Sequence, residues 1–337
     1  MYRIPILLLL GLLSFFRTSV VVAAPQVNPP LSEIRQRGNV TVEGKLVGID
    51  NPTSTIRFRV DRTIRGEFKH GVTRVLVPQE TLALFSSQVT YVLVLVVLAP
   101  DPKSKAMTLV DVPTLFVAEG AAPAIYLATP EARELFDEKH ALLEGTPAYK
   151  SHLLAQLKNP DPQLVELFCA ELLLRAEIRT DLSAAESSAV LDLVKNDMLR
   201  PPTRARILLA ASNQFFDVAK PEVDLQSISV LRHLPSNVAL SGFDNSTELL
   251  LAALRHFSNK IELAGTLPPD VLTKYLRSSH PAIVEASVLL LHRVAPNDVD
   301  HLVAQALDYT LLNRDARSVL VEFQRRQEMT TGNESSK

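Results

Sequence analysis

Histidine is the residue type in this chain that could most readily hold a metal ion, and the chain has eight histidines. His280, His292 and His301 belong to one predicted pair of helices and could converge across it. None of them has the His-x-x-x-His or His-Glu-x-x-His spacing that puts two ligands on one helix face. We therefore expect no metal site, and we expect His280 to cap a turn.

The other histidines are scattered along the chain. His233 and His256, like His292, lie near predicted helix ends, where the helix dipole favours the charged imidazolium. His140 and His152 flank the predicted junction between two domains. An envelope-associated enzyme, or an enzyme subunit, with a site at this junction is therefore an alternative to a protein without catalytic activity.

Three acids, Asp161, Glu166 and Glu171, lie close together along one predicted helix. Two carboxylates can act as a general acid and a general base when they face one reacting group. Helical carboxylates are nevertheless far more common on a solvated face than in a catalytic pair. We expect a solvated face here.

The remaining motifs also argue against catalysis. The single cysteine, Cys169, lies in the apolar helical stretch Leu167–Ala170, which predicts a buried and inert thiol. The chain has no Gly-x-Ser-x-Gly elbow, and its 11 glycines form no phosphate-binding loop. The sequence thus predicts no catalytic residue, no cofactor and no metal.

Residues 1–23 have the pattern of a secretory signal peptide. Arg3 precedes the almost continuously apolar segment Ile4–Phe16, and small residues then lead to a cleavage site. A retained membrane anchor is the alternative, but Arg17 would then lie inside the span, at a cost of roughly 2.5–3.5 kcal/mol. We expect cleavage, no stable membrane insertion afterwards, and an exported protein that is periplasmic or secreted.

The net charge indicates which classes of partner the protein binds, and the cysteine content indicates which kind of organism it comes from. Removal of residues 1–23, which carry two arginines and no acids, changes the formal charge from −2 to −4. A nucleic-acid-binding protein needs a basic face, and the one basic cluster, Arg200–Arg206, is expected to connect two helices. We therefore expect no nucleic-acid partner. An exported chain that cannot form an internal disulfide favours a bacterial envelope protein.

Residues 39–120 alternate apolar and polar side chains with the period of two that is typical of strands. Val89–Leu98 differs, because it is apolar at nearly every position, which predicts a central strand covered on both faces. Together these segments predict a small barrel or sandwich of about 85 residues. The expected strands are Val40–Leu46, Ile56–Val60, Arg74–Val77, Val89–Leu98 and Ala106–Val112, with Leu115–Val117 as a further candidate.

Three sequence motifs in residues 39–120 are similar to those of a known protein family. They are Val42-Glu43-Gly44, the run from Ile56 to Glu67 that ends in Arg65-Gly66-Glu67, and Tyr91-Val92-Leu93-Val94-Leu95. Over about residues 40–117 the chain resembles a netrin-like module, which implies an OB-type barrel. The zinc-chelating inhibitory mechanism of that family does not carry over, because it uses an N-terminal disulfide-bonded cysteine and this module contains no cysteine.

A short phrase occurs twice in the C-terminal half. Pro162-Gln163-Leu164-Val165-Glu166 reappears as Pro281-Ala282-Ile283-Val284-Glu285, 119 residues later. This distance is close to three periods of about 40 residues, the length of a repeat of two helices. In both copies a proline follows the end of one helix and begins the next.

Apolar residues recur with helical spacing through residues 148–327. Four helix pairs are predicted, and Ser246–Phe257 belongs to a less regular middle unit in which Lys220–Asp244 is a further helix candidate. The four pairs are Tyr149–Leu157 with Gln163–Glu177, Ala184–Lys195 with Thr203–Phe215, Pro269–Leu276 with Ala282–Val294, and Asn297–Leu307 with Arg314–Arg326.

This region resembles HEAT-type repeats across about residues 148–326. Thr203-Arg204 and Asp315-Ala316-Arg317 echo the Asp-Val-Arg phrase that follows the turn in that family. The resemblance implies a solenoid with an extended concave surface, which suits a protein or peptide partner.

The sequence therefore predicts an α+β chain with a small β-barrel or sandwich followed by an all-α solenoid. We expect an exported, non-enzymatic scaffold that binds a protein or peptide through its helical surface. A small-ligand carrier that uses the barrel is a further alternative. The expected boundaries are 1–23 for the signal peptide, 24–38 for a linker, 39–120 for the barrel, 121–147 for a linker with a short helix, 148–327 for the helical repeats and 328–337 for a disordered tail.

Overall fold

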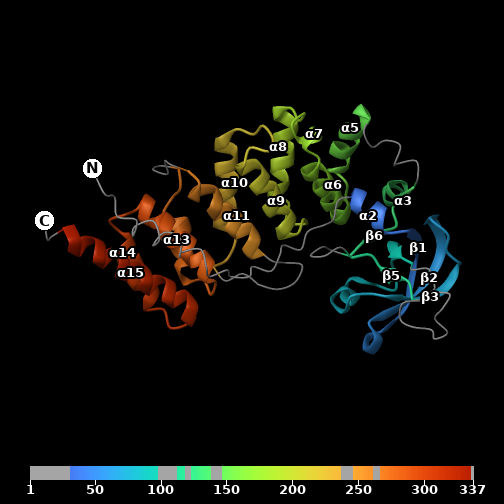
Figure 1. The fold of residues 1–337 in the computed structure, drawn as a ribbon, viewed down its shortest axis with the longest axis horizontal. Helices are drawn as coiled ribbons and strands as arrows, with labels where there is room; N and C mark the ends of the chain where they lie inside the picture. The colour runs from blue at the N-terminus through green and yellow to red at the C-terminus, as the bar shows by residue number, and fades with distance from the viewer. Residues whose placement is uncertain are drawn as a thin grey trace, which may run out of the picture.

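The computed structural model describes residues 31–97, 112–117, 123–137, 146–236, 246–260 and 266–334. Within them a β-barrel is followed by a stack of helices, so the predicted fold class is confirmed. The molecule is elongated, with the barrel at one end and the last helices at the other (Figure 1). The predicted signal peptide and His140 lie outside the described residues.

Five strands close the barrel. They are hydrogen-bonded in the order β1-β2-β3-β5-β4, and β4 also pairs with β1. All of these pairs are antiparallel except β3 with β5, which is parallel. A sixth strand, β6, pairs with β4 beside β5. The strands are β1 (Val40–Asp50), β2 (Thr55–Arg65), β3 (Gly71–Leu76), β4 (Thr90–Val96), β5 (Thr114–Leu115) and β6 (Ile125–Leu127), with short 3₁₀ helices η2 (Asn51–Thr53) and η3 (Gln79–Leu84).

Strand β1 closes the barrel because it pairs with two strands at once. Gly44 lies opposite Val60 on β2 and opposite Tyr91 on β4. A Cβ atom at this position would come within 1.9 Å of the Arg59 carbonyl oxygen. Only glycine permits so close an approach of two backbones.

The prediction that Val89–Leu98 contains a strand covered on both faces is confirmed, because Tyr91–Leu95 are all buried in β4. Tyr91, Leu93 and Leu95 point into the barrel core. Val92 and Val94 belong instead to the core formed with the helices, among them α2 (Leu31–Arg37) and α3 (Pro130–Phe136). One strand thus serves two cores, and this explains why its sequence does not alternate.

The helices of the C-terminal half form five pairs, stacked along the molecule (Figure 1). In each pair the second helix contacts the second helix of the next pair, which gives the stack α6-α9-α11-α13-α15. The pairs are α5 (Pro147–Gln156) with α6 (Pro162–Leu174), α8 (Ala184–Asp192) and η5 (Leu193–Lys195) with α9 (Pro201–Ser212), α10 (Lys220–His233) with α11 (Ser246–Ser258), α12 (Asp270–Thr273) and η6 (Lys274–Arg277) with α13 (Pro281–Val294), and α14 (Val299–Leu307) with α15 (Arg314–Glu334); the short α7 (Ala176–Arg179) follows α6.

The four predicted pairs are confirmed, and their helices begin and end within three residues of the expected positions except for α15, which continues to Glu334, eight residues past Arg326. The middle unit is more regular than expected, because α10 and α11 form an ordinary pair that α9 and α13 flank. The period is uneven. The second helices begin at Pro162, Pro201, Ser246, Pro281 and Arg314, so successive starts lie 39, 45, 35 and 33 residues apart.

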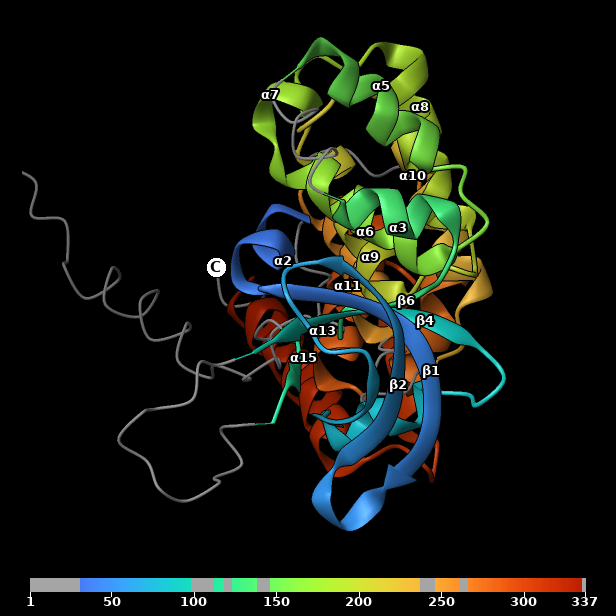
Figure 2. The same ribbon diagram turned by 90° about the vertical axis from the view of Figure 1, so that its right-hand side faces the viewer.

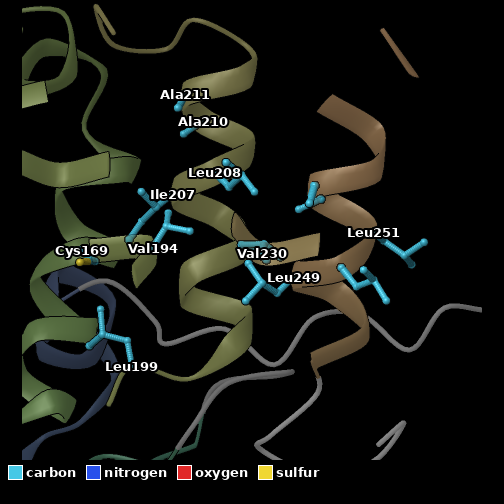
Figure 3. Packing of buried hydrophobic residues seen from close by; sticks show 14 of the residues in the cluster. Cys169, Val194, Leu199, Ile207, Leu208, Ala210, Ala211, Val230, Leu249 and Leu251 are labelled. Atoms are coloured by element: carbon cyan, nitrogen blue, oxygen red, sulfur yellow. The ribbon is translucent and has the colours of Figure 1, made fainter. Parts of the chain in front are cut away.

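A single hydrophobic core runs from β4 and β6 through every helix pair to α15. Its packing is visible within two of the pairs, where Val194 of η5 lies near Ile207 of α9 and Val230 of α10 lies near Leu249 of α11 (Figure 3). The outer face of β4 and part of β6 thus pack into the core of the helices, while the interior of the barrel forms a second hydrophobic cluster.

Both predicted linkers contain structure. Residues 31–37, within the expected linker 24–38, form α2, whose Leu31 and Ile34 are fully buried, and α2 contacts α6 (Figure 2). Residues 125–127, within the expected linker 121–147, form β6. These segments are short, so packing against neighbours decides their structure more than local pattern does.

Two further points concern the expected strands and the C-terminal tail. The expected strand Ala106–Val112 lies outside the described residues except for Val112, and the further candidate Leu115–Val117 overlaps β5 (Thr114–Leu115) at Leu115. The tail expected to be disordered from residue 328 is helical through Glu334. Among the described residues, no helix is both long enough and apolar enough to cross a membrane.

Candidate binding site

The three acids of α6 are buried, so the expectation of a solvated face is wrong. Asp161, Glu166 and Glu171 are 4%, 2% and 0% exposed. The reason is the position of α6, which α2, α5, α7 and α9 all contact. A helix covered on every side buries whatever its sequence places there, and a buried carboxylate requires a partner.

The buried carboxylates of Glu166 and Glu171 accept hydrogen bonds from neighbouring side chains and backbone. Glu166 accepts hydrogen bonds from the backbone N–H and the Nε of Arg200, both at 2.6 Å. Glu171 accepts from the Tyr149 hydroxyl at 3.1 Å and from the Arg175 Nε at 2.5 Å. These carboxylates therefore tie α6 to α9 and α5.

Asp161 has a local function. Its Oδ1 accepts from the backbone N–H of Gln163 at 2.9 Å and thereby caps α6. Burial raises the pKa of Asp161, since the charged carboxylate loses hydration there.

Cys169 is buried in α6, as predicted. Burial raises the pKa of its thiol far above the ordinary value. A thiol of this kind does not form the reactive thiolate near neutral pH.

The histidines singled out from the sequence have separate environments. His292 packs edge-on against Phe323, and the His301 Nε2 lies 2.7 Å from Gln305. His280 occupies the N-cap position of α13 and is buried. His152 packs edge-on against Phe168, and burial lowers its pKa. In the part of the chain that the structure describes, no three His, Cys, Asp or Glu side chains are grouped so that they could hold a metal ion.

A pocket of about 630 Å³ opens where α9 and α11 end and α10 begins, and we call it the α9–α11 pocket. This volume lies in the range of small-ligand and side-chain sites. Its lining combines apolar side chains with amides and cations. The lining residues are Ala211, Ser212, Gln214, Val218, Lys220, Val223, His256, Asn259 and Lys260.

The first wall of the pocket is an unusual helix end. After α9, Gln214 adopts a left-handed backbone with φ of 57°. Its N–H bonds to the Ala211 carbonyl at 3.0 Å, and the Phe215 N–H bonds to the Ala210 carbonyl at 2.9 Å. This is the Schellman pattern, in which glycine is the usual residue at the left-handed position. The chain places a long amide side chain there, and that residue lines the pocket.

The second wall contains a shared carboxylate. Asp224 Oδ1 lies 2.6 Å from the His256 Nε2 and also bonds to the Lys260 Nζ. Burial lowers the pKa of His256, and although the Asp224 carboxylate opposes this shift, burial is the larger effect. The sequence suggested a charged imidazolium at this helix end, whereas burial here favours the neutral imidazole.

The third wall is the beginning of α10. Its N-cap, Ala219, provides no side-chain hydrogen bond, the second helical residue, Pro221, has no N–H group, and the Glu222 N–H bonds to the Ala219 carbonyl at 2.9 Å. Lys220, the first helical residue, is exposed and has no acidic partner within ion-pair distance among the described residues. The helix dipole and this ammonium group both favour an anion at this end of the pocket.

A smaller pocket of about 300 Å³ lies between α5 and α7. Lys150 lines it, but the Lys150 Nζ is already paired with Asp181 and Glu186, each at 3.1 Å. Its cation is therefore less available to a ligand than Lys220 in the α9–α11 pocket.

Sequence reasoning did not find the α9–α11 pocket. His256 and Asp224 are 32 residues apart in successive helices, so their pairing depends on how the helices stack. Gln214 gave no signal, since only the three-dimensional structure shows its left-handed backbone. The comparisons with protein-family models, with curated proteins and with solved structures found no match.

Proposed function

We propose that this protein is an exported, non-enzymatic scaffold and that the α9–α11 pocket binds an acidic side chain or terminal carboxylate of a peptide segment in a partner protein. The observation that carries this proposal is the group of donors that line the pocket: the Lys220 ammonium group and the side-chain amides of Gln214 and Asn259. Export rests on the sequence of residues 1–23 alone.

The charges at the pocket favour an anion. Lys260 is partly neutralised by Asp224, but Lys220 is not paired with an acid among the described residues. Of the two lysines that line the pocket, only Lys260 bonds to Asp224, so Lys220 adds a positive charge there. A carboxylate bound there would form charge-assisted hydrogen bonds, which are stronger than bonds between neutral groups.

An apolar side chain next in sequence to Gln214 supports a peptide rather than a small ion. Phe215 follows Gln214 and is 49% exposed, with the Arg179 guanidinium 4.9 Å from its ring centre. Half-exposed aromatic residues beside a polar pocket are typical of the residues that dominate protein interfaces. A peptide with an acidic residue next to an apolar residue would use both features.

We also propose that the helical stack is of the HEAT type. Arg204 and Arg317, the arginines of the two segments that resemble the family's Asp-Val-Arg motif, each donate to a backbone carbonyl of the preceding helix. Arg204 Nε donates to the Val194 carbonyl and Arg317 Nη1 to the Leu307 carbonyl, both at 2.7 Å. Each arginine on a second helix thus holds the end of the preceding helix. Side-chain bonds also link successive pairs at a spacing of 34 residues, as between Gln226 and Asp192.

For the barrel we propose a netrin-like module of the OB type. The closed strand order with a parallel β3–β5 pair supports this assignment. The barrel interior is filled by side chains such as Phe58, Tyr91 and Leu93. For this reason we favour partner binding over the small-ligand carrier.

The proposal is tested by selecting peptides from a random display library against the purified full chain. We expect the selected peptides to share an acidic residue or to require a free C-terminal carboxylate. Lys220→Glu should lose these peptides, while Lys158→Glu, which reverses an exposed charge in another helix pair, should retain them. Peptides without an acid, or equal retention by both variants, would overturn the proposal.

A second candidate function is favoured by the pair of Asp224 and His256. A neutral imidazole oriented by a carboxylate can act as a general base, and Ser212 lines the same pocket. In an enzyme, Ser212→Ala and His256→Gln would both abolish turnover of an ester substrate. A scaffold would show no such turnover in the unaltered chain.

A further inference from the structure

The outer face of β1, β2 and β3 carries four cations in two adjacent rows. In one row Lys45 lies directly opposite Arg59, and in the next row Arg57 lies directly opposite Arg74. Like charges at opposed positions destabilise a sheet. The stability of the barrel therefore does not explain why these cations are placed together.

Nearby acids balance only half of this charge. Arg59 pairs with Asp61 at 3.1 Å and Arg74 with Asp50 at 3.4 Å, and all four side chains are largely exposed. Such pairs are weak, because water and salt screen them. Lys45 and Arg57 have no acidic partner within ion-pair distance in the described part of the chain.

Arg57 has room because its neighbour is a glycine. Gly48 lies opposite Arg57, and a Cβ atom at Gly48 would come within 2.6 Å of Nη2 of that arginine. The guanidinium thus lies flat over the strand while Arg57 remains exposed. This orientation leaves the guanidinium accessible to an anion.

Aliphatic side chains lie among these cations. Val72, opposite Arg59, is 60% exposed. Val47, the extra residue where the register shifts between Leu46 and Gly48, is 45% exposed. A soluble anion would contact the cations of this face but would leave its aliphatic side chains in water. At a lipid surface the cations contact headgroup phosphates and the aliphatic side chains are removed from water.

We propose that this face of the barrel binds the surface of a bilayer that contains anionic phospholipid. Lys45, Arg57, Arg59 and Arg74 would contact lipid phosphates, while Val47 and Val72 would enter the headgroup region. The barrel forms one end of the elongated molecule, and the β1–β2 hairpin projects from it (Figures 1 and 2). This surface is separate from the α9–α11 pocket, so it does not depend on the function proposed there.

The test is co-sedimentation of the full chain with vesicles of phosphatidylcholine alone or with about 30% phosphatidylglycerol. We expect binding to the anionic vesicles that is lost at about 0.5 M salt, because the attraction is between exposed charges. Lys45→Gln with Arg57→Gln should weaken binding about 25-fold, since each cation near the surface contributes about fivefold. Val47→Ser with Val72→Ser should weaken it without changing its dependence on salt.

The matched control is Arg325→Gln with Arg326→Gln, which removes two exposed cations from α15 and should leave binding unchanged. Pure phosphatidylcholine vesicles measure any contribution of the apolar segment Ile4–Phe16. Equal binding by the Lys45/Arg57 variant and the unaltered chain would overturn the proposal. So would binding to heparin or to nucleic acid but not to anionic vesicles, which would assign the face to a soluble polyanion.

Discussion

Gln214 has a left-handed backbone conformation, which stability alone does not favour for a residue with a Cβ atom. Left-handed backbone costs a residue with a Cβ about 1–2 kcal/mol, and glycine avoids this cost. The φ of Gln214 is 57° at a helix end where glycine is usual. Strain of this kind is often retained where a side chain has a function, and the side chain of Gln214 lines the α9–α11 pocket.

We therefore predict that Gln214→Gly raises the free energy of unfolding by about 0.5–1 kcal/mol, the backbone strain less the larger entropy that glycine loses on folding. The same change should weaken peptide binding, because it removes an amide from the pocket. Urea denaturation measures the first effect. Asn213→Gly is the control, since Asn213 has a φ of −87° and gains nothing from glycine. If Gln214→Gly left the free energy of unfolding unchanged, the turn would not be strained.

His256 predicts a pH dependence of stability. Its pKa in the folded chain is below the ordinary value of 6.5, chiefly because of burial. As the pH falls through 6.5, the unfolded chain therefore binds a proton before the folded chain does, and the free energy of unfolding decreases. Above that pH both states are neutral at this residue and the effect is absent.

Thermal unfolding at several pH values between 7 and 5 checks this sign. His256→Gln should reduce the loss of stability on acidification, whereas His301→Gln, at an exposed position, should leave the loss as it is. An equally steep loss in His256→Gln would mean that other groups, such as the partly buried His152, cause it.

At the scale of elements, buried ion pairs connect the helices. Glu166 on α6 and Arg200, which begins α9, form the best example, with the carboxylate 2% exposed. Removing one member of a buried pair leaves the other charge without compensation. We predict that Arg200→Met lowers the free energy of unfolding by about 3–5 kcal/mol.

Chemical denaturation measures this loss. Arg326→Met removes an arginine from an exposed pair with Glu322 and should cost at most about 1 kcal/mol. The double change Glu166→Leu with Arg200→Met should recover much of the stability, because no buried charge is then left alone. A small effect of Arg200→Met alone would show that water reaches the Glu166 carboxylate.

The sequence predicts elements that have a long pattern of their own. The helix pairs and β4 could be recognised because apolar residues recur over ten or more positions. The short elements α2 and β6 could not, since contacts with distant residues form them. The burial of Glu166 and the pairing of Asp224 with His256 were missed for the same reason, as each depends on which helix packs beside which.

At the scale of the whole molecule, the outer face of β4 packs into the core of the helices, so we expect the barrel and the helices to unfold together. Phe136 lies at their junction, fully buried and 5.3 Å from the ring of Tyr126. We predict that Phe136→Ala lowers stability by about 3–5 kcal/mol and accelerates amide hydrogen exchange in both β4 and α6. The control is Leu311→Ala, at a site that is 77% exposed. Faster exchange in β4 alone would mean that the two parts unfold independently.

Substitution of Lys220 tests the recognition of an acidic peptide segment most directly, because Lys220 is exposed and lines the α9–α11 pocket. The measurement is the affinity of the full chain, with and without Lys220→Glu, for a labelled acidic peptide obtained by selection. We predict at least a tenfold loss, which corresponds to about 1.4 kcal/mol and is within the range for a charge-assisted contact. An affinity that Lys220→Glu leaves unchanged would contradict binding at the α9–α11 pocket.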